Sequence, residues 1–165
     1  MPGTGKSTLG KLLSKALSQH FIDTDDLISD RLKMPMQLAL DTLGFDAFSS
    51  VEQRILLSIN EMKAVIATGG SAIYQKEAIL QLKKTAIVIH LSASYETLTQ
   101  RIENFSSRAI AMSKDMSFQD LYDERMPLYE AVADIHFITD QYEYTLEESL
   151  ELILNEICAF RRGVK

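Results

Sequence analysis

Two patterns of hydrophobic and polar positions alternate along the chain. Apolar residues recur every three or four positions between Ser7 and Leu17, which predicts an amphipathic helix that begins at the Lys-Ser-Thr of residues 6–8. Helical spacing returns over residues 27–32, 36–43, 48–62 and 146–160. Apolar runs of strand length occur in HFID, AVIA, TAIVIHLS and DIHFITD. Apolar strands separated by helices predict an α/β fold of three layers, a parallel sheet with helices on both faces.

The composition changes this picture little. A length of 165 residues with 46% hydrophobic content fits a single domain over residues 1–165. The formal charge of -6 argues against nucleic acid and anionic membrane as partners, and no apolar run approaches the roughly 18 residues of a membrane span. Cys158 has no second cysteine to pair with and is expected to be buried, which fits a reducing compartment. We expect a cytoplasmic monomer.

The periodicity stops between Arg101 and Asp123. This stretch, ENFSSRAIAMSKDMSFQD, is polar and rich in serine. Segments of this kind between regular elements often close over a substrate. The sequence therefore predicts a lid at about residues 103–118.

The sequence PGTGKST at residues 2–8 carries most of a phosphate-binding loop, whose pattern is Gly, four residues, Gly, Lys, then Ser or Thr. Gly3, Thr4 and Gly5 would offer backbone N–H groups to phosphate oxygens, and Lys6 would supply a cation. The Ser7 hydroxyl would reach Mg²⁺. The alternative is a glycine turn that caps an ordinary helix.

The pattern begins before the chain does. Its leading glycine would precede Met1 by one residue, and no apolar strand comes before the loop. We therefore expect Met1 to be an internal residue of the loop and the first strand of the sheet to be absent from this chain. A missing central strand would leave a slot in the sheet and unpaired backbone groups beside it.

Two acids follow the HFID strand. Asp23 and Asp25 stand at its predicted carboxyl end, where ligands gather in open α/β sheets. Continued alternation would turn these two side chains to one side and Thr24 to the other. One carboxylate could order Mg²⁺, and the other could orient a substrate hydroxyl and accept its proton. Alternatively, Asp25 or Asp26 caps the next helix.

Glycines and arginines complete the candidate chemistry. Gly69 and Gly70 end the AVIA strand, where the lack of a side chain lets a ligand approach the main chain. Arg101, Arg108 and Arg125 could stabilise phosphoryl charge or bind a carboxylate. The histidines are expected to be structural, because they lack metal-ligand spacing: His20, His90 and His136.

The order GTGKST, FIDTDD, TGG, the arginines about the lid and RMPLY resembles the shikimate kinases, P-loop enzymes of the nucleoside-monophosphate-kinase type. The resemblance implies a five-stranded parallel sheet and transfer of the ATP γ-phosphoryl group to a hydroxyl of shikimate. It assigns the ATP phosphates to residues 3–8 with Thr8 included, Mg²⁺ to Ser7 and Asp23, adenine to Arg101, and catalysis to Lys6, Asp25 and the lid residue Arg108. It assigns the acceptor to Asp25, Gly69, Gly70 and Arg125.

The chain departs from the family mainly at the acceptor side. Phe45 stands where the family has an acid, and Ser49 where it has a carboxylate-binding arginine. Ser71 replaces a third glycine and Ala109 the proline of the lid. Arg54 lies five residues after Ser49 and points elsewhere on a helix. Two alternatives therefore stay open: a kinase for another small polyol or sugar acid, and a nucleotide-binding relative without turnover.

Overall fold

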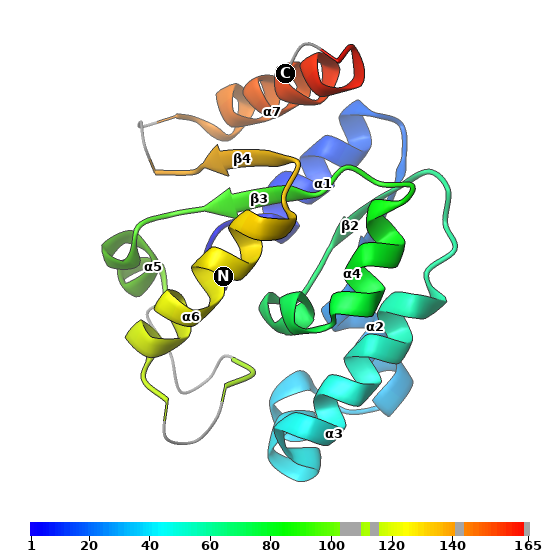
Figure 1. Cartoon of the computed structure of the whole chain (residues 1–165), viewed down its shortest axis with the longest axis vertical. Helices are drawn as coiled ribbons and strands as arrows, with labels where there is room; N and C mark the ends of the chain where they lie inside the picture. The colour runs from blue at the N-terminus through cyan, green and yellow to red at the C-terminus, as the bar shows by residue number, and fades with distance from the viewer. Residues whose placement is uncertain (103–109, 113–115, 141–143, 164–165) are drawn as a thin grey trace.

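The elements of the computed structural model follow the predicted alternation of helices and strands (Figure 1). The structure describes residues 1–102, 110–112, 116–140 and 144–163. The first half contains α1 (Lys6–Ala16), β1 (His20–Asp23), α2 (Thr24–Leu32), α3 (Met36–Ser58), β2 (Ala64–Ala67) and the 3-10 helix η1 (Gly70–Tyr74). The second half contains α4 (Lys76–Lys83), β3 (Ile89–Ser92), α5 (Tyr95–Arg101), α6 (Phe118–Val132), β4 (Ile135–Ile138) and α7 (Leu146–Arg161).

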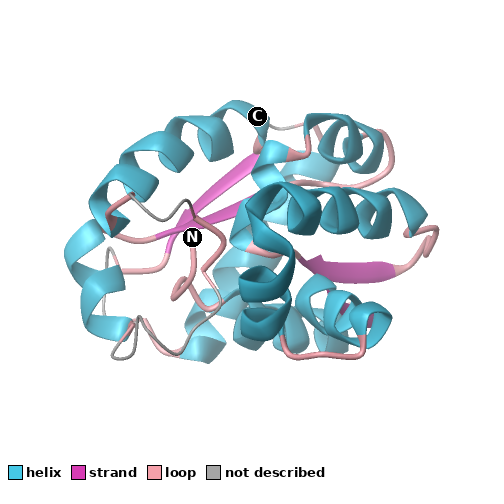
Figure 2. Ribbon diagram, turned by 90° about the horizontal axis from the view of Figure 1, so that it is seen from below, coloured by secondary structure: helices cyan, strands magenta, loops and turns pink. Residues whose placement is uncertain are grey.

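The strands form two parallel pairs. β1 pairs with β2 in a register that runs from His20 opposite Ala64 to Asp23 opposite Ala67. β3 pairs with β4, from Ile89 opposite Ile135 to Ser92 opposite Ile138. Among the described residues these four strands form two pairs with no ladder between them, rather than the five-stranded sheet that the resemblance implies. Helices lie on both sides of the strands (Figure 2), so the three-layer prediction is confirmed.

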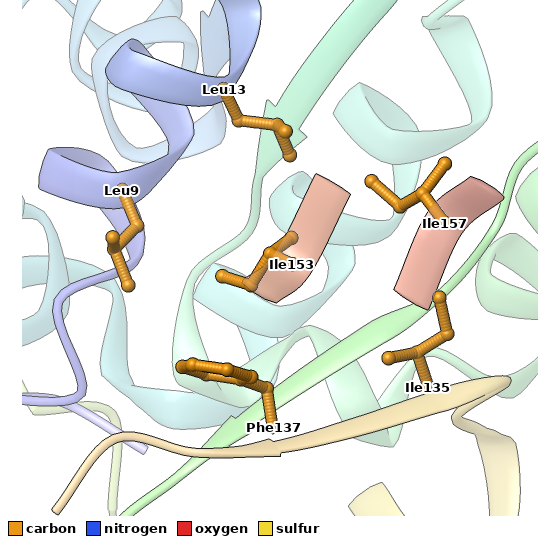
Figure 3. Packing of buried hydrophobic residues seen from close by; sticks show 6 residues of the cluster. All are labelled: Leu9, Leu13, Ile135, Phe137, Ile153 and Ile157. Carbon is orange, nitrogen blue, oxygen red and sulfur yellow. The ribbon is translucent and has the colours of Figure 1, made fainter. Parts of the chain in front are cut away.

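One hydrophobic core joins α1 and α7 to β4. Figure 3 shows Leu9 and Leu13 of α1 and Ile153 and Ile157 of α7 directed toward the side chains of this strand. The β4 members of the cluster are Ile135 and Phe137, which are 0% and 8% exposed. Gly10 lets α1 approach β1, because a Cβ on this residue would lie 2.8 Å from the Phe21 ring. This packing fixes the start of α1, where the loop ends.

The helices α2 and α3 form a second body at one end of the molecule (Figure 1). Ile28 and Phe48, both 0% exposed, anchor its core. The two helices predicted over residues 36–43 and 48–62 correspond to the two parts of α3, which meet in a kink at Gly44, where φ is 74° and ψ is 170°. The element ends at Ser58, four residues earlier than predicted. Because of the kink, both halves of α3 pack on α2.

The structure corrects three other expectations. The strand alternation expected to continue to Asp25 stops at Asp23, the last residue of β1, because Thr24 already begins α2. The run TAIVIHLS contributes only its last four residues to β3. Cys158 is exposed, because the buried face of α7 is made by Ile153 and Ile157 and the next residue lies about 100° further round the helix.

Two further predictions concern a membrane span and the lid. No described helix is long and apolar enough to cross a membrane. Most of the lid predicted at residues 103–118 lies outside the described residues, which include only 110–112 and 116–118 of it.

Candidate active site

A cleft of about 590 Å³ opens where the loop before α1 meets the carboxyl ends of β1 and β2. Residues of α6 and of the segment 110–111 close its other side. The cleft brings together eleven of the residues singled out from the sequence: Gly3, Gly5, Lys6, Ser7, Thr8, Asp23, Asp25, Gly69, Gly70, Arg101 and Arg125. Thr4 does not line it, and Arg108 lies outside the described residues.

The loop before α1 is shaped by two left-handed glycines. Gly3 and Gly5 have φ values of 82° and 85°, which a side chain would strain. Gly5 is the N-cap of α1 and no side chain caps the helix, so its first N–H groups remain available to an anion. The Thr4 side chain is 2% exposed and its hydroxyl donates to the Met1 carbonyl at 3.0 Å. Thr4 therefore braces the loop from behind.

Lys6 follows the cap on the cleft side. Its ammonium donates to the Met1 carbonyl oxygen at 2.6 Å. This contact folds the lysine back along the loop, beside the first turn of α1. Positive charge, a helix N-terminus and close-approaching backbone together suit a phosphate.

Ser7 and Asp23 converge from α1 and the end of β1. The Ser7 hydroxyl donates to Asp23 Oδ2 at 2.7 Å. One hydroxyl and one carboxylate fit Mg²⁺, which prefers oxygen ligands and takes few from the protein when phosphates and water supply the rest. Among the described residues no group of three or more His, Cys, Asp or Glu side chains could hold a metal alone.

Asp25 reaches the same cleft from the first turn of α2. The predicted strand alternation of Asp23 and Asp25 is wrong, because the helix begins at Thr24. The capping alternative is also wrong in its residue: Asp23 caps α2, accepting from the Asp25 N–H at 3.1 Å. Asp25 Oδ1 is buried without a hydrogen-bond partner. Burial, then the charge of Asp23, raises the pKa of Asp25 against the opposing charge of Lys6.

Gly69 and Gly70 face carboxylate and guanidinium groups. A Cβ on Gly69 would lie 2.8 Å from Asp25 Oδ1 and 3.0 Å from Glu52 Oε1. A Cβ on Gly70 would lie 3.0 Å from Arg125 Nη1. The turn is held by the Gly69 N–H, which donates to the Thr24 hydroxyl at 3.0 Å. A side chain at either glycine would therefore collide with groups on the acceptor side of the cleft.

Arg125 projects from α6 to the wall of the cleft beside Gly70 and is 1% exposed. Its Nε donates to the Tyr74 hydroxyl at 3.1 Å, and its Nη2 donates to the Ala111 carbonyl. Tyr129, one turn further along α6, donates to the Gly70 carbonyl at 2.6 Å. The RMPLY segment thus ties the arginine and the glycine turn together.

Glu52, which no sequence motif singled out, lies directly behind the cleft, with Oε1 3.0 Å from the position of a Cβ on Gly69. It is 1% exposed and accepts from the Ser71 hydroxyl at 2.9 Å, while its Oε2 has no hydrogen-bond partner. Burial raises the pKa of Glu52 to about 7, and the charge of Asp25 adds to the effect. Ser49 accepts from the Gln75 amide at 2.5 Å. Helical spacing of three residues from Ser49 was the available signal for Glu52.

The other predicted residues divide between the cleft and the core. Arg101, at the end of α5, lines the cleft and donates to the Thr139 hydroxyl at 3.2 Å. Arg54 is exposed and donates to the Ser50 carbonyl, so it points away as predicted. His90 is 7% exposed and stacks on Tyr129 with ring centroids 5.0 Å apart. Burial lowers the pKa of His90 to about 4, which fits the predicted structural role.

Comparison with known proteins matches this arrangement to one family. The family model described as shikimate kinase matches residues 2–158. The chain belongs to the shikimate kinase family. A shikimate kinase of Haemophilus influenzae is 33% identical over 159 residues, which cover 94% of this chain and 85% of that protein. One from Mannheimia succiniciproducens is 34% identical over 159 residues, 93% of this chain and 91% of its own.

Solved shikimate kinases share the fold. The enzyme from Acinetobacter baumannii, in complex with shikimate, superposes with a TM-score of 0.82 at 27% identity, covering 95% of this chain and 88% of that one. The enzyme from Aquifex aeolicus gives a TM-score of 0.81 at 24% identity and covers 99% and 95%. As a member of the shikimate kinase family, the chain is an ATP-dependent kinase with a hydroxyl acceptor.

Proposed function

We propose that this kinase transfers the γ-phosphoryl group of ATP to a hydroxyl of shikimate. The observation that carries the proposal is the placement of Asp25. A half-buried carboxylate, whose Oδ1 is buried and has no hydrogen-bond partner, lines the same cleft as Lys6 and the glycine loop. The relatives named shikimate kinase and the structure of one of them with shikimate support this acceptor.

On the nucleotide side, the loop of residues 3–8 binds the phosphates through backbone N–H groups and Lys6. Ser7 and Asp23 would hold Mg²⁺, which neutralises charge on the β- and γ-phosphates when bound. Arg101 lies at the cleft wall, where we propose that it contacts the adenine. Arg108, from the lid segment, is proposed to neutralise charge on the transferred group.

On the acceptor side, Asp25 orients the reacting hydroxyl and takes its proton. Its raised pKa makes it a stronger base than an exposed aspartate, and the missing hydrogen bond on Oδ1 leaves a lone pair for that proton. Gly69 and Gly70 let the ring of the acceptor approach the main chain, and Arg125 binds its carboxylate. The acceptor oxygen thus loses its proton to Asp25 and bonds to the γ-phosphorus, while the bond from that phosphorus to the β,γ-bridging oxygen breaks and ADP leaves.

The proposal includes a working unit and a location. We propose a monomer as the active form, because the loop, Asp25 and Arg125 already meet in one cleft without a second copy. We place the reaction in the cytoplasm, where ATP is abundant and an exposed thiol such as Cys158 stays reduced.

A second candidate acceptor is a polyol or sugar acid other than shikimate. It is favoured by the acceptor side, where Ser49 and Gln75 form a neutral pair next to the buried acid Glu52. Neutral donors and acceptors beside an acid suit hydroxyl groups better than a carboxylate, which would need a cation there. Retention of Asp25 and Lys6 in one cleft speaks against a relative that binds nucleotide without turnover.

An ADP-release assay distinguishes these candidates. Shikimate, its methyl ester, quinate and a panel of polyols and sugar acids would each be offered with ATP and Mg²⁺, and the phosphorylated product identified by mass spectrometry. We expect turnover with shikimate at the lowest acceptor KM. Turnover only with another compound would transfer the proposal to that compound, and ATP binding without any turnover would overturn it.

A further inference from the structure

Arg125 is 1% exposed, and Tyr74, Ala111 and Tyr129 all lie within reach of its guanidinium. The Nε and Nη2 nitrogens donate to the Tyr74 hydroxyl and the Ala111 carbonyl. The third nitrogen, Nη1, lies beside Gly70 at the wall of the cleft. A guanidinium recognises a carboxylate only when its donors are aimed correctly, because its fork is planar and rigid. Whatever fixes the Nε edge therefore also sets the direction of Nη1.

Tyr74 contacts this arginine in two ways. Its hydroxyl accepts from Nε at 3.1 Å, and its ring centroid lies 5.0 Å from the Arg125 Cζ. The contact with the ring limits where the guanidinium can lie, and the hydrogen bond limits where its Nε can point. Together they leave the side chain one orientation.

The tyrosine is itself held from two sides. Its hydroxyl donates to Glu124 Oε1 at 2.6 Å, so that its lone pairs remain for the arginine. The Phe45 ring packs edge-on against it, with centroids 6.0 Å apart and planes at 79°. Tyr74 also ends η1, the short helix that begins at Gly70. Tyr74 thus contacts Arg125 directly and belongs to the same short helix as Gly70.

We infer that Tyr74 is a positioning residue for the acceptor: it aims the Arg125 guanidinium at the acceptor carboxylate from outside the cleft. The inference rests on the proposed function, in which Arg125 binds that carboxylate. Tyr74 does not line the cleft and has no place in the phosphoryl transfer itself. Its loss should therefore raise the KM for the acceptor and leave kcat and the KM for ATP nearly unchanged.

Two variants separate the contributions of the ring and the hydroxyl. Tyr74→Phe keeps the ring and removes the bond to Nε, and we expect the KM for shikimate to rise about 3- to 10-fold. Tyr74→Leu removes both contacts, with an expected rise of about 10- to 100-fold. Shikimate methyl ester, which lacks the charge, should show a KM that these substitutions do not change.

Tyr122→Phe is the matched control. Tyr122 lies on α6, as Arg125 does, and its hydroxyl donates to the Ala93 carbonyl at 3.2 Å, away from the cleft. This control should keep the parent KM for shikimate. Thermal unfolding of all three variants identifies any general loss of fold. A Tyr74→Phe variant that keeps the parent KM for shikimate, or changes the KM for the acid and the ester equally, would overturn the inference.

A readout without turnover keeps the inference apart from the proposed function. The Arg125 Nε–H signal, assigned by its loss in Arg125→Lys, should be visible in ¹⁵N NMR spectra of the parent and exchange faster with water in Tyr74→Phe. It should also shift when shikimate is added to the parent. No shikimate turnover by the parent would refute the proposed function, whereas equal exchange in the parent and Tyr74→Phe would refute the role of Tyr74.

Discussion

The two sides of the cleft are built in different ways. The nucleotide side uses one continuous loop, whose glycine backbone and following helix make a phosphate site from neighbouring residues. The acceptor side joins residues from four elements, with Asp25 on α2, Glu52 on α3, Ser71 in η1 and Arg125 on α6. Chemistry is therefore concentrated in a local motif, while acceptor choice depends on side chains that meet only in the folded chain.

The comparison extends to charge. The nucleotide side places Lys6 and a helix N-terminus around an anion. On the acceptor side, the half-buried Asp25 and the buried Glu52 flank Gly69, and each has one buried oxygen without a hydrogen-bond partner. Unpaired buried oxygens cost stability, so we expect the acceptor side to be the less stable half and the one most easily changed by substitution.

The largest effect should come from Asp25→Asn. If the carboxylate takes the proton of the acceptor, kcat should fall by about 10²- to 10⁴-fold, while the Kd for ATP stays within about threefold. Steady-state kinetics and calorimetric titration with ATP measure the two quantities. Asp26→Asn, at the exposed neighbouring position, is the control and should keep the parent kcat. Equal losses of turnover and ATP binding would show that the two sides are not separable.

Glu52→Gln tests how the buried carboxyl group of Glu52 changes the free energy of unfolding with pH. Because the folded-state pKa of about 7 lies above the ordinary glutamate pKa of 4.5, the folded state binds the proton more tightly than the unfolded state. The parent should therefore lose stability as the pH rises from about 4.5 to 7, by up to about 3 kcal/mol. Urea unfolding at pH 5 and pH 8 measures this loss.

In Glu52→Gln this contribution to the pH dependence should disappear, and the variant should gain stability on the parent as the pH rises. Glu61→Gln, at an exposed position, should follow the parent at both pH values. The same slope in the parent and in Glu52→Gln would show that Glu52 does not titrate in this range.

The smallest expected effect is a gain at the acceptor side. Ser49→Arg would place a guanidinium near Glu52, whose Oε2 is unpartnered, and should lower the KM for shikimate about tenfold. Ser50→Arg, at the exposed neighbouring position, adds the same charge and should leave that KM unchanged. An unchanged or higher KM for shikimate in Ser49→Arg would favour an acceptor other than shikimate.

The same division explains what the sequence could predict. The order of helices and strands depends on short-range patterns, and the structure confirms it. The assignments of phosphates to the loop and of Mg²⁺ to Ser7 and Asp23 stay predictions, although these residues line one cleft. Asp25 was placed in the right cleft for the wrong reason, because the Asp23 cap starts α2 one residue after the strand ends. An N-cap aspartate followed by two acids was a signal for that boundary.

The acceptor side could not be predicted in the same way. The partner of Ser49 is Gln75, 26 residues away, and the partner of Arg125 is Tyr74, 51 residues away. No periodicity relates such positions, since the contacts depend on how η1 packs between α3 and α6. The exposure of Cys158 has a simpler reason. Its position on the helix, about 100° round the axis of α7 from Ile157, outweighs the preference of cysteine for the interior.

That exposed thiol has a practical consequence. Cys158 is the only cysteine in the chain, and it lies on α7, outside the residues that line the cleft. A single maleimide dye would therefore attach at one defined point and leave the substrate sites untouched. Paired with a fluorescent nucleotide, such a label would act as a distance ruler for following occupancy of the cleft in real time.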